Sequence, residues 1–142
     1  MTTHKYISTS VIETEKLGEL LASKLSGGTV VAMYGDIGAG KTAFTHGLAR
    51  GLGITERVTS PTFSIVNEYN GKFRFCHFDM YRLSCADELY DIGWQDYLNN
   101  QTICAVEWSE NIEDALPKDS VIVKITPINE NSREIQISNI NL

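Results

Sequence analysis

The sequence contains few cysteines, and none of them has the spacing of a metal site or a disulfide framework. Its three cysteines, Cys76, Cys85 and Cys104, form no Cys-x-x-Cys pair. An odd number without that spacing indicates neither zinc binding nor structural disulfides. Cys76 and Cys104 lie within apolar runs, so we expect both to be buried as small hydrophobic residues.

Long apolar segments and an excess of positive charge are also missing. The N-terminal segment MTTHKYIS has no apolar stretch typical of a signal peptide, and no apolar run approaches the length of a membrane span. We therefore expect a cytoplasmic protein with no membrane association. The formal net charge of −6 argues against a surface that binds nucleic acid as a whole, but it is compatible with a local basic patch that contacts RNA.

The composition is that of a folded globular protein. A chain of 142 residues with 42% hydrophobic residues is large and apolar enough to bury one core, so we expect a single domain over residues 1–142. Ser10 and Glu13 have the spacing of a capping box at the start of a helix. Leucines recur at helical intervals up to Leu25, and we expect the glycines at 27–28 to end this helix.

Apolar and β-branched runs predict the strands, and longer periodic stretches predict the helices. The dipeptide Asn70-Gly71 between two alternating runs indicates a tight β-hairpin. Helices alternate with strands early in the chain and hairpins follow, so we expect an α/β fold: a mixed, mostly parallel central sheet with helices on both faces and antiparallel hairpins. The expected strands are 6–7, 29–34, 63–69, 72–78, 102–107, 120–126 and 134–140, and the further helices are 41–52 and 86–98.

The segment 35–42, GDIGAGKT, matches the phosphate-loop pattern G-x-x-x-x-G-K-[ST] at every fixed position. Glycines let the backbone curl until successive N–H groups converge on phosphate oxygens, and the following helix presents its positive end to the same anion. Lys41 would contact the β- and γ-phosphates, and the Thr42 hydroxyl would bind Mg²⁺. We therefore expect ATP and Mg²⁺ as cofactors, held by Gly35, Asp36, Ile37, Gly38, Ala39, Gly40, Lys41 and Thr42.

Two acids end apolar strands and could serve the metal. Ligands collect at the carboxyl ends of strands in open α/β sheets. Glu107 ends the run TICAVE, and we favour it as the Mg²⁺ ligand. Asp79 ends the run FCHFD, and we expect it to act as an outer-shell ligand or to orient the attacking water. A solvated loop start is the ordinary alternative for each acid taken alone.

Three further residues near these motifs have two interpretations each. Thr62 could sense the γ-phosphate as a switch threonine does, or it could simply belong to a Pro-Thr turn. Trp108 could cover the nucleotide or a partner, although its pattern alone favours core packing. His77 is best explained as filling a position in the sheet, because no nucleophile lies beside it for it to activate.

Four separated motifs together resemble one family. GDIGAGKT (35–42), SPTFSIVNEY (60–69), HFDMYRL (77–83) and VEWSE (106–110) are similar, in this order, to those of the bacterial tRNA threonylcarbamoyladenosine biosynthesis ATPase family TsaE, also called YjeE. The resemblance implies a small ATPase with a P-loop α/β fold. It also implies two partners, TsaB and TsaD, with which the family attaches threonylcarbamoyl to a tRNA adenosine beside the anticodon, the transfer itself belonging to TsaD.

The resemblance also implies roles for individual residues. Lys41 and Thr42 correspond to phosphate and Mg²⁺ contacts, and Glu107 to a Mg²⁺ ligand. Asp79 and Thr62 correspond to residues needed around the γ-phosphate. The residues that the resemblance places near the nucleotide or its base are Trp108, Arg133, Ser10 and Thr14.

Other nucleotide-binding functions remain as alternatives. A small-molecule P-loop kinase usually has an arginine-rich lid, whereas the arginines here are scattered. A GTPase would carry Asn-Lys-x-Asp and Asp-x-x-Gly, and both motifs are absent. A third alternative is a subunit that binds ATP as a structural switch without turning it over. No arginine finger is obvious, so transition-state charge would be met by a partner's arginine or by Arg82. The arginines are Arg50, Arg57, Arg74, Arg82 and Arg133.

Overall fold

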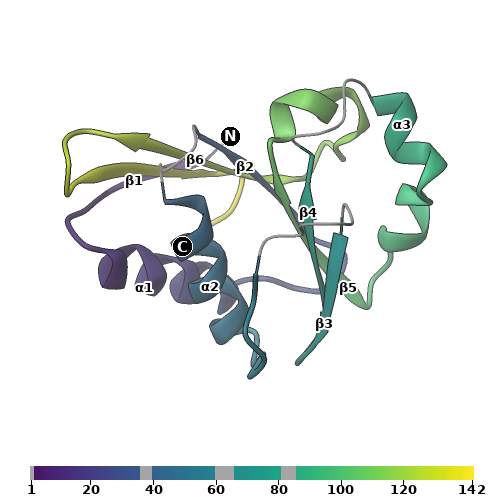
Figure 1. Ribbon diagram of the computed structural model, residues 1–142, viewed down its shortest axis with the longest axis horizontal. Helices are drawn as coiled ribbons and strands as arrows, with labels where there is room; N and C mark the ends of the chain where they lie inside the picture. The colour runs from purple at the N-terminus through teal and green to yellow at the C-terminus, as the bar shows by residue number, and fades with distance from the viewer. Residues whose placement is uncertain (1, 36–39, 60–65, 81–85) are drawn as a thin grey trace.

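The computed structural model describes residues 2–35, 40–59, 66–80 and 86–142 (Figure 1). Several residues with predicted roles lie outside these ranges. They are Asp36, Ile37, Gly38, Ala39, Thr62 and Arg82.

A single seven-stranded sheet runs through the described part of the chain. Its strand order is β1-β7-β6-β2-β5-β4-β3, and the central neighbours β6, β2, β5 and β4 are parallel to one another. The outer pairs β1–β7, β7–β6 and β4–β3 are antiparallel. The expected mixed, mostly parallel sheet is therefore confirmed. The strands are β1 (Thr3–Ser8), β2 (Val30–Tyr34), β3 (Val66–Asn70), β4 (Arg74–Asp79), β5 (Thr102–Glu107), β6 (Val121–Pro127) and β7 (Arg133–Ser138).

Helices cover both faces of this sheet, as expected (Figure 1). Residues of β5 alternate between the two faces: Ile103 and Ala105 join the core beneath α1 and α2, and Cys104 and Val106 join the core on the opposite face. This alternation allows one buried strand to serve two hydrophobic layers. The helices are α1 (Val11–Ala22) and α2 (Lys41–Gly51) on one face, with α3 (Ala86–Asp91) and the 3₁₀ segments η1 (Trp94–Tyr97) and η2 (Ser109–Ala115) on the other.

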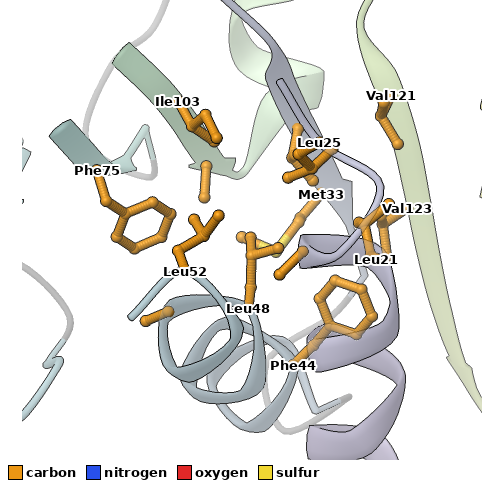
Figure 2. Close-up of a cluster of buried hydrophobic side chains, with 14 of the residues drawn as sticks. Leu21, Leu25, Met33, Phe44, Leu48, Leu52, Phe75, Ile103, Val121 and Val123 are labelled. Carbon is orange, nitrogen blue, oxygen red and sulfur yellow. The ribbon is translucent and has the colours of Figure 1, made fainter. Parts of the chain in front are cut away.

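The apolar side of α2 fixes this helix on the sheet. Phe44, Leu48 and Leu52 recur at helical spacing and are each at most 2% exposed. Figure 2 shows Leu52 next to Phe75 of β4, Leu48 next to Met33 of β2, and Phe44 next to Val123 of β6, all in one cluster. Fully burying a side chain of this kind stabilises a fold by about 1.5–3 kcal/mol. The position of the N-terminus of α2 relative to the strand ends is thus set by core packing.

The cysteines Cys76 and Cys104 are buried, as the sequence predicts. Burial raises the pKa of the Cys104 thiol to about 12 and that of Cys76 to about 11, so both remain protonated and unreactive at neutral pH. No helix in the described ranges has the length and apolar character that a bilayer crossing requires.

The first helix begins where predicted but ends earlier. Ser10 is its N-cap and accepts a hydrogen bond from the Glu13 amide at 3.1 Å. The Glu13 carboxylate accepts hydrogen bonds from the Thr9 side chain and backbone, which lower its pKa. The expected end at 27–28 is wrong, because the chain turns directly after Ala22 with a bond from Lys24 N to Leu21 O at 2.9 Å.

Two other expectations needed correction. The β3–β4 hairpin forms, but Asn70 still pairs with Arg74, so the loop has three residues instead of a tight Asn-Gly turn. The loop packs on the end of α2: Lys72 N donates to Leu52 O at 2.9 Å, and a Cβ at Gly71 would lie 2.6 Å from that oxygen. The expected helix 86–98 is broken into α3 and η1 at Gly93, whose φ of 80° is left-handed.

Glycines allow α1 and α2 to pack with their backbones close together. A Cβ at Gly47 would overlap the carbonyl of Glu15, and one at Gly18 would overlap the carbonyl of Phe44. In an isolated helix, Gly→Ala stabilises by up to about 1 kcal/mol. At Gly18 and Gly47 we expect Gly→Ala to destabilise the fold instead, because α1 and α2 must separate to admit a methyl group.

We predict that Gly47→Ala lowers the free energy of unfolding by about 2 kcal/mol. Urea unfolding of the full chain measures this change. The control is Lys16→Ala on the exposed side of α1, where a change within about 0.5 kcal/mol is expected. An unchanged or raised stability for Gly47→Ala would show that the two helices do not pack as closely as described.

Candidate functional site

The carboxyl ends of β2, β4 and β5 lie at one edge of the sheet. Asp79 and Glu107 end their strands as expected, and they are direct partners in the parallel register of β4 and β5. Ala32 pairs with Val106 in the β2–β5 ladder, so extending the register by one residue places Glu107 beside Met33. The two acids therefore lie level with the last residues of the strand that leads into the segment 35–42.

The helix that follows this segment begins at the same edge. Gly40 is the N-cap of α2 with φ 113° and ψ 12°, a left-handed conformation that costs a non-glycine residue about 1–2 kcal/mol. Space is not the constraint, since a Cβ there would lie 3.8 Å from the nearest atom, in Ile125. Backbone N–H groups and the positive end of the helix dipole therefore face the strand ends.

Lys41 is a charged residue buried at the start of α2. It is 6% exposed, and its Nζ is buried without a hydrogen-bond partner among the described residues. An ammonium group has three donors, and burying it without acceptors is costly. An anion bound at this edge would supply the acceptors that Lys41 lacks.

The indole of Trp108 provides a contact for this ammonium. The Lys41 Nζ lies 4.1 Å from the centroid of the Trp108 ring, within cation–π range. Trp108 has φ 58° and ψ 43°, an uncommon conformation for a bulky side chain that costs about 1–3 kcal/mol. Its ring is partly buried and also packs against the core under η2, which agrees with the core-packing interpretation, and the covering of a nucleotide or partner stays a prediction.

A buried histidine bonds to the acid at the end of β5. His77 Nε2 and Glu107 Oε2 lie 2.9 Å apart, with the two side chains 1% and 7% exposed. The sequence interpretation, a histidine that fills the sheet, describes its position but misses this bond. Alternation along β4 puts His77 on the face of Asp79, and this pattern is the signal that could have revealed the contact.

Comparison with known proteins decides the family of this chain. A family model described as "Threonylcarbamoyl adenosine biosynthesis protein TsaE" matches residues 8–135. The chain belongs to the TsaE family. The tRNA threonylcarbamoyladenosine biosynthesis protein TsaE of Treponema pallidum is 36% identical over 132 residues, covering 93% of this chain and 98% of that protein. Its counterpart in Bacillus subtilis is 44% identical over 124 residues, covering 87% and 77%.

A solved structure shows the same fold. The crystal structure of Bacillus subtilis YdiB has a TM-score of 0.85 and 35% sequence identity to this chain, and the match covers 99% of this chain and 87% of that one. The expected α/β class is thereby confirmed. The roles predicted for individual side chains are not tested by these likenesses, and they stay predictions.

The donor set of this TsaE-family site suits a magnesium ion. Thr42 is exposed on the first turn of α2, and Glu107 supplies a buried carboxylate. Within the described residues there is no cluster of three or more His, Cys, Asp or Glu side chains that could hold a metal alone. Mg²⁺ is usually bound by one or two protein oxygens together with phosphates and water. A hydroxyl and a carboxylate beside the start of a helix fit that requirement.

The remaining candidates lie at the same end of the TsaE-family fold. The Thr14 methyl group would lie 3.9 Å from a Cβ at Gly40, which places the start of α1 beside the start of α2. Ser10 caps α1 with its hydroxyl. Arg133 begins β7 opposite the last residue of β1, and its Nη1 donates to carbonyls of the preceding turn. The structure thus brings Thr14 near the start of α2, and it engages Ser10 and Arg133 in local hydrogen bonds.

Two further hollows are lined by described residues. One of about 460 Å³ is lined by residues from the second half of α2 and the loop after it, among them His46, Arg50 and Val58. Another of about 560 Å³ lies over β6 and β7 and includes Tyr34 and Lys124. Neither includes Lys41 or Glu107.

We predict that Lys41→Met leaves the ligand-free chain as stable as the wild type or stabilises it by up to about 2 kcal/mol. The substitution removes a buried ammonium whose desolvation is only partly offset by the contact with Trp108. Thermal and urea unfolding without added nucleotide measure the effect. Clear destabilisation would mean that the ammonium has better partners in the ligand-free chain than the structure shows.

Proposed function

We propose that this TsaE-family chain binds Mg-ATP at the segment 35–42 and hydrolyses it in support of tRNA threonylcarbamoyladenosine biosynthesis. The observation that carries the proposal is the buried Lys41 ammonium at the start of α2, beside two strand-end acids in register. A buried cation without an acceptor costs stability, so its presence is best explained by a function that supplies an anion.

Each residue has a distinct task in this proposal. Lys41 contacts the β- and γ-phosphates, together with backbone N–H groups of the segment 35–42. Thr42 and Glu107 hold Mg²⁺, which neutralises phosphate charge when bound. Asp79 orients water for in-line attack, and Thr62 contacts the γ-phosphate.

Trp108 covers the same region from the side of β5. Its indole is held against Lys41 by the backbone turn that follows Glu107. Stacked in this way, the ring excludes water from one side of the ammonium, which strengthens the attraction of that ammonium for phosphate. We place the adenine base of ATP on the side of the site where Ser10 and Arg133 lie.

Hydrolysis by the isolated chain should be slow, because the described arginines offer little to the γ-phosphate. Arg50 lies in the last turn of α2 and Arg74 begins β4, at the ends opposite to Lys41 and Asp79. Arg57 lies in the loop after α2 and lines the same hollow as Arg50. Arg133 donates to carbonyls of its own turn. A cation for the transition state would come from Arg82 or from a partner protein.

We further propose that the partners are TsaB and TsaD, with tRNA contacted indirectly or through a local patch. The names of the relatives place those proteins in tRNA threonylcarbamoyladenosine biosynthesis. ATP hydrolysis by this chain would then reset or regulate the complex that performs the transfer.

We predict that TsaB, TsaD and tRNA together stimulate phosphate release from ATP, and that Thr42→Ala and Glu107→Ala each lower the stimulated rate about a hundredfold. Losing a metal ligand removes several kcal/mol of transition-state stabilisation. The matched control for Glu107→Ala is Glu130→Ala, an exposed acid in the β6–β7 turn, with an unchanged rate.

Two outcomes would contradict the proposal. If phosphate release by the wild type with all components stays at the level of Thr42→Ala, the chain is no ATPase under these conditions. That result would favour the alternative of a subunit that binds ATP as a structural switch. If phosphate is recovered on an acceptor in stoichiometric amounts instead of as free phosphate, the protein is a kinase. Chromatography of products from γ-labelled ATP distinguishes these cases.

A further inference from the structure

We propose that His77 is a positioning residue for Glu107: it occupies the carboxylate oxygen Oε2 and leaves Oε1 as the oxygen that binds Mg²⁺. The inference rests on the proposed function, because it assigns Glu107 to the metal. It adds a residue and a binding mode, in which Glu107 binds the metal through one oxygen.

The parallel register of β4 and β5 brings the two side chains together. His77 pairs with Ala105, and Asp79 pairs with Glu107. His77 and Glu107 are therefore diagonal neighbours on the same face, two positions out of register. Side chains as long as imidazole and glutamate span such a diagonal. The observed distance from His77 Nε2 to Glu107 Oε2 is 2.9 Å.

The chemistry of the bond indicates the proton arrangement. A carboxylate can only accept hydrogen bonds, so we assign the proton to Nε2, which donates to Oε2. The other ring nitrogen, Nδ1, is buried without a partner among the described residues. A proton there would be a buried donor without an acceptor, whereas a bare nitrogen costs less. The Nε2–H group thus holds Oε2 with one hydrogen bond and leaves Oε1 for Mg²⁺.

A buried carboxylate at a metal site needs such a partner. Glu107 is 6% exposed, so little water is available to hold its second oxygen. Its side chain has several rotatable bonds, and only some of their orientations direct an oxygen to the metal. Hydrogen bonds from outer partners select the productive orientation, and losing them typically lowers metal affinity about 10–100-fold.

The test measures Mn²⁺ binding instead of turnover, with ADP as the probe nucleotide. Free Mn²⁺ is followed by electron paramagnetic resonance during titration of the full chain with ADP present, and calorimetry in EDTA gives ADP affinity without metal. We expect His77→Leu to weaken Mn²⁺ binding about tenfold or more with little change in metal-free ADP affinity. His77→Gln, whose amide nitrogen can donate at a similar reach, should bind Mn²⁺ within about threefold of wild type.

Two controls separate positioning from general damage. His46→Leu removes another imidazole, whose Nε2 bonds to Val58 O at 2.8 Å near the other end of α2, and should leave Mn²⁺ binding unchanged. Thermal unfolding of every variant reports folding. If His77→Leu does not fold, the comparison of His77→Gln with His77→Asn tests the positioning role. The shorter Asn side chain does not reach Glu107, so His77→Asn should bind Mn²⁺ as weakly as a chain in which Glu107 has no partner.

The outcomes distinguish this inference from the proposed function. If the wild type with ADP binds no Mn²⁺, or binds it equally in Glu107→Ala, the metal assignment fails. If binding depends on Glu107 but the folded variants His77→Leu or His77→Asn equal the wild type, the positioning role is overturned and the proposed function stands. Equal loss in His77→Gln and His77→Leu would also overturn it, because the donor would then not be the cause.

Discussion

Two charged side chains of opposite sign, Lys41 and Glu107, are buried where the parallel strands of the sheet end. Burying either charge is costly unless it has polar partners. Glu107 has one from His77, and Lys41 has the face of Trp108. The arrangement of this edge follows from that constraint: a histidine, an indole in an uncommon backbone conformation and a helix start all meet the two charges.

The hydrophobic core maintains this arrangement from both sides of the sheet. On one side, the apolar residues of α2 pack on the sheet, and α1 packs closely against α2 through glycines (Figures 1 and 2). This packing holds the start of α2 at the strand ends. On the other side, the core beneath α3 and η2 includes Val106 and packs against Trp108. Trp108 therefore contacts both this core and the Lys41 ammonium. A TsaE-family site can thus keep an unfavourable charge in place, since packing elsewhere offsets its cost.

Features that depend on neighbouring residues could be predicted from the sequence, and features that depend on tertiary contacts could not. The cap at Ser10, the apolar stripe of α2 and the strand-end position of Glu107 are encoded locally, and each was found. The early end of α1 was missed because a turn formed before the expected glycines. The three-residue hairpin loop depends on its packing against the carbonyl of Leu52, which no local pattern reveals.

The same distinction applies to the site. Lys41 and Thr42 follow from one motif, whereas the bond between His77 and Glu107 joins residues thirty positions apart and depends on the strand register. The contact of Trp108 with Lys41 likewise requires the left-handed backbone after Glu107. The positions of Lys41, Thr42 and the strand-end acids could therefore be predicted from the sequence, whereas the contacts that hold the charged groups could not.

Paramagnetic broadening of backbone amide signals tests the location of the site most directly. A ¹⁵N-labelled full chain would be titrated with Mn²⁺ and a non-hydrolysable ATP analogue, with Mg²⁺ as the diamagnetic reference. We expect the signals of Gly40, Lys41, Asp79 and Glu107 to broaden first. Broadening centred on the hollow near Val58 or on that over β6 and β7, with Gly40 and Glu107 unaffected, would contradict it.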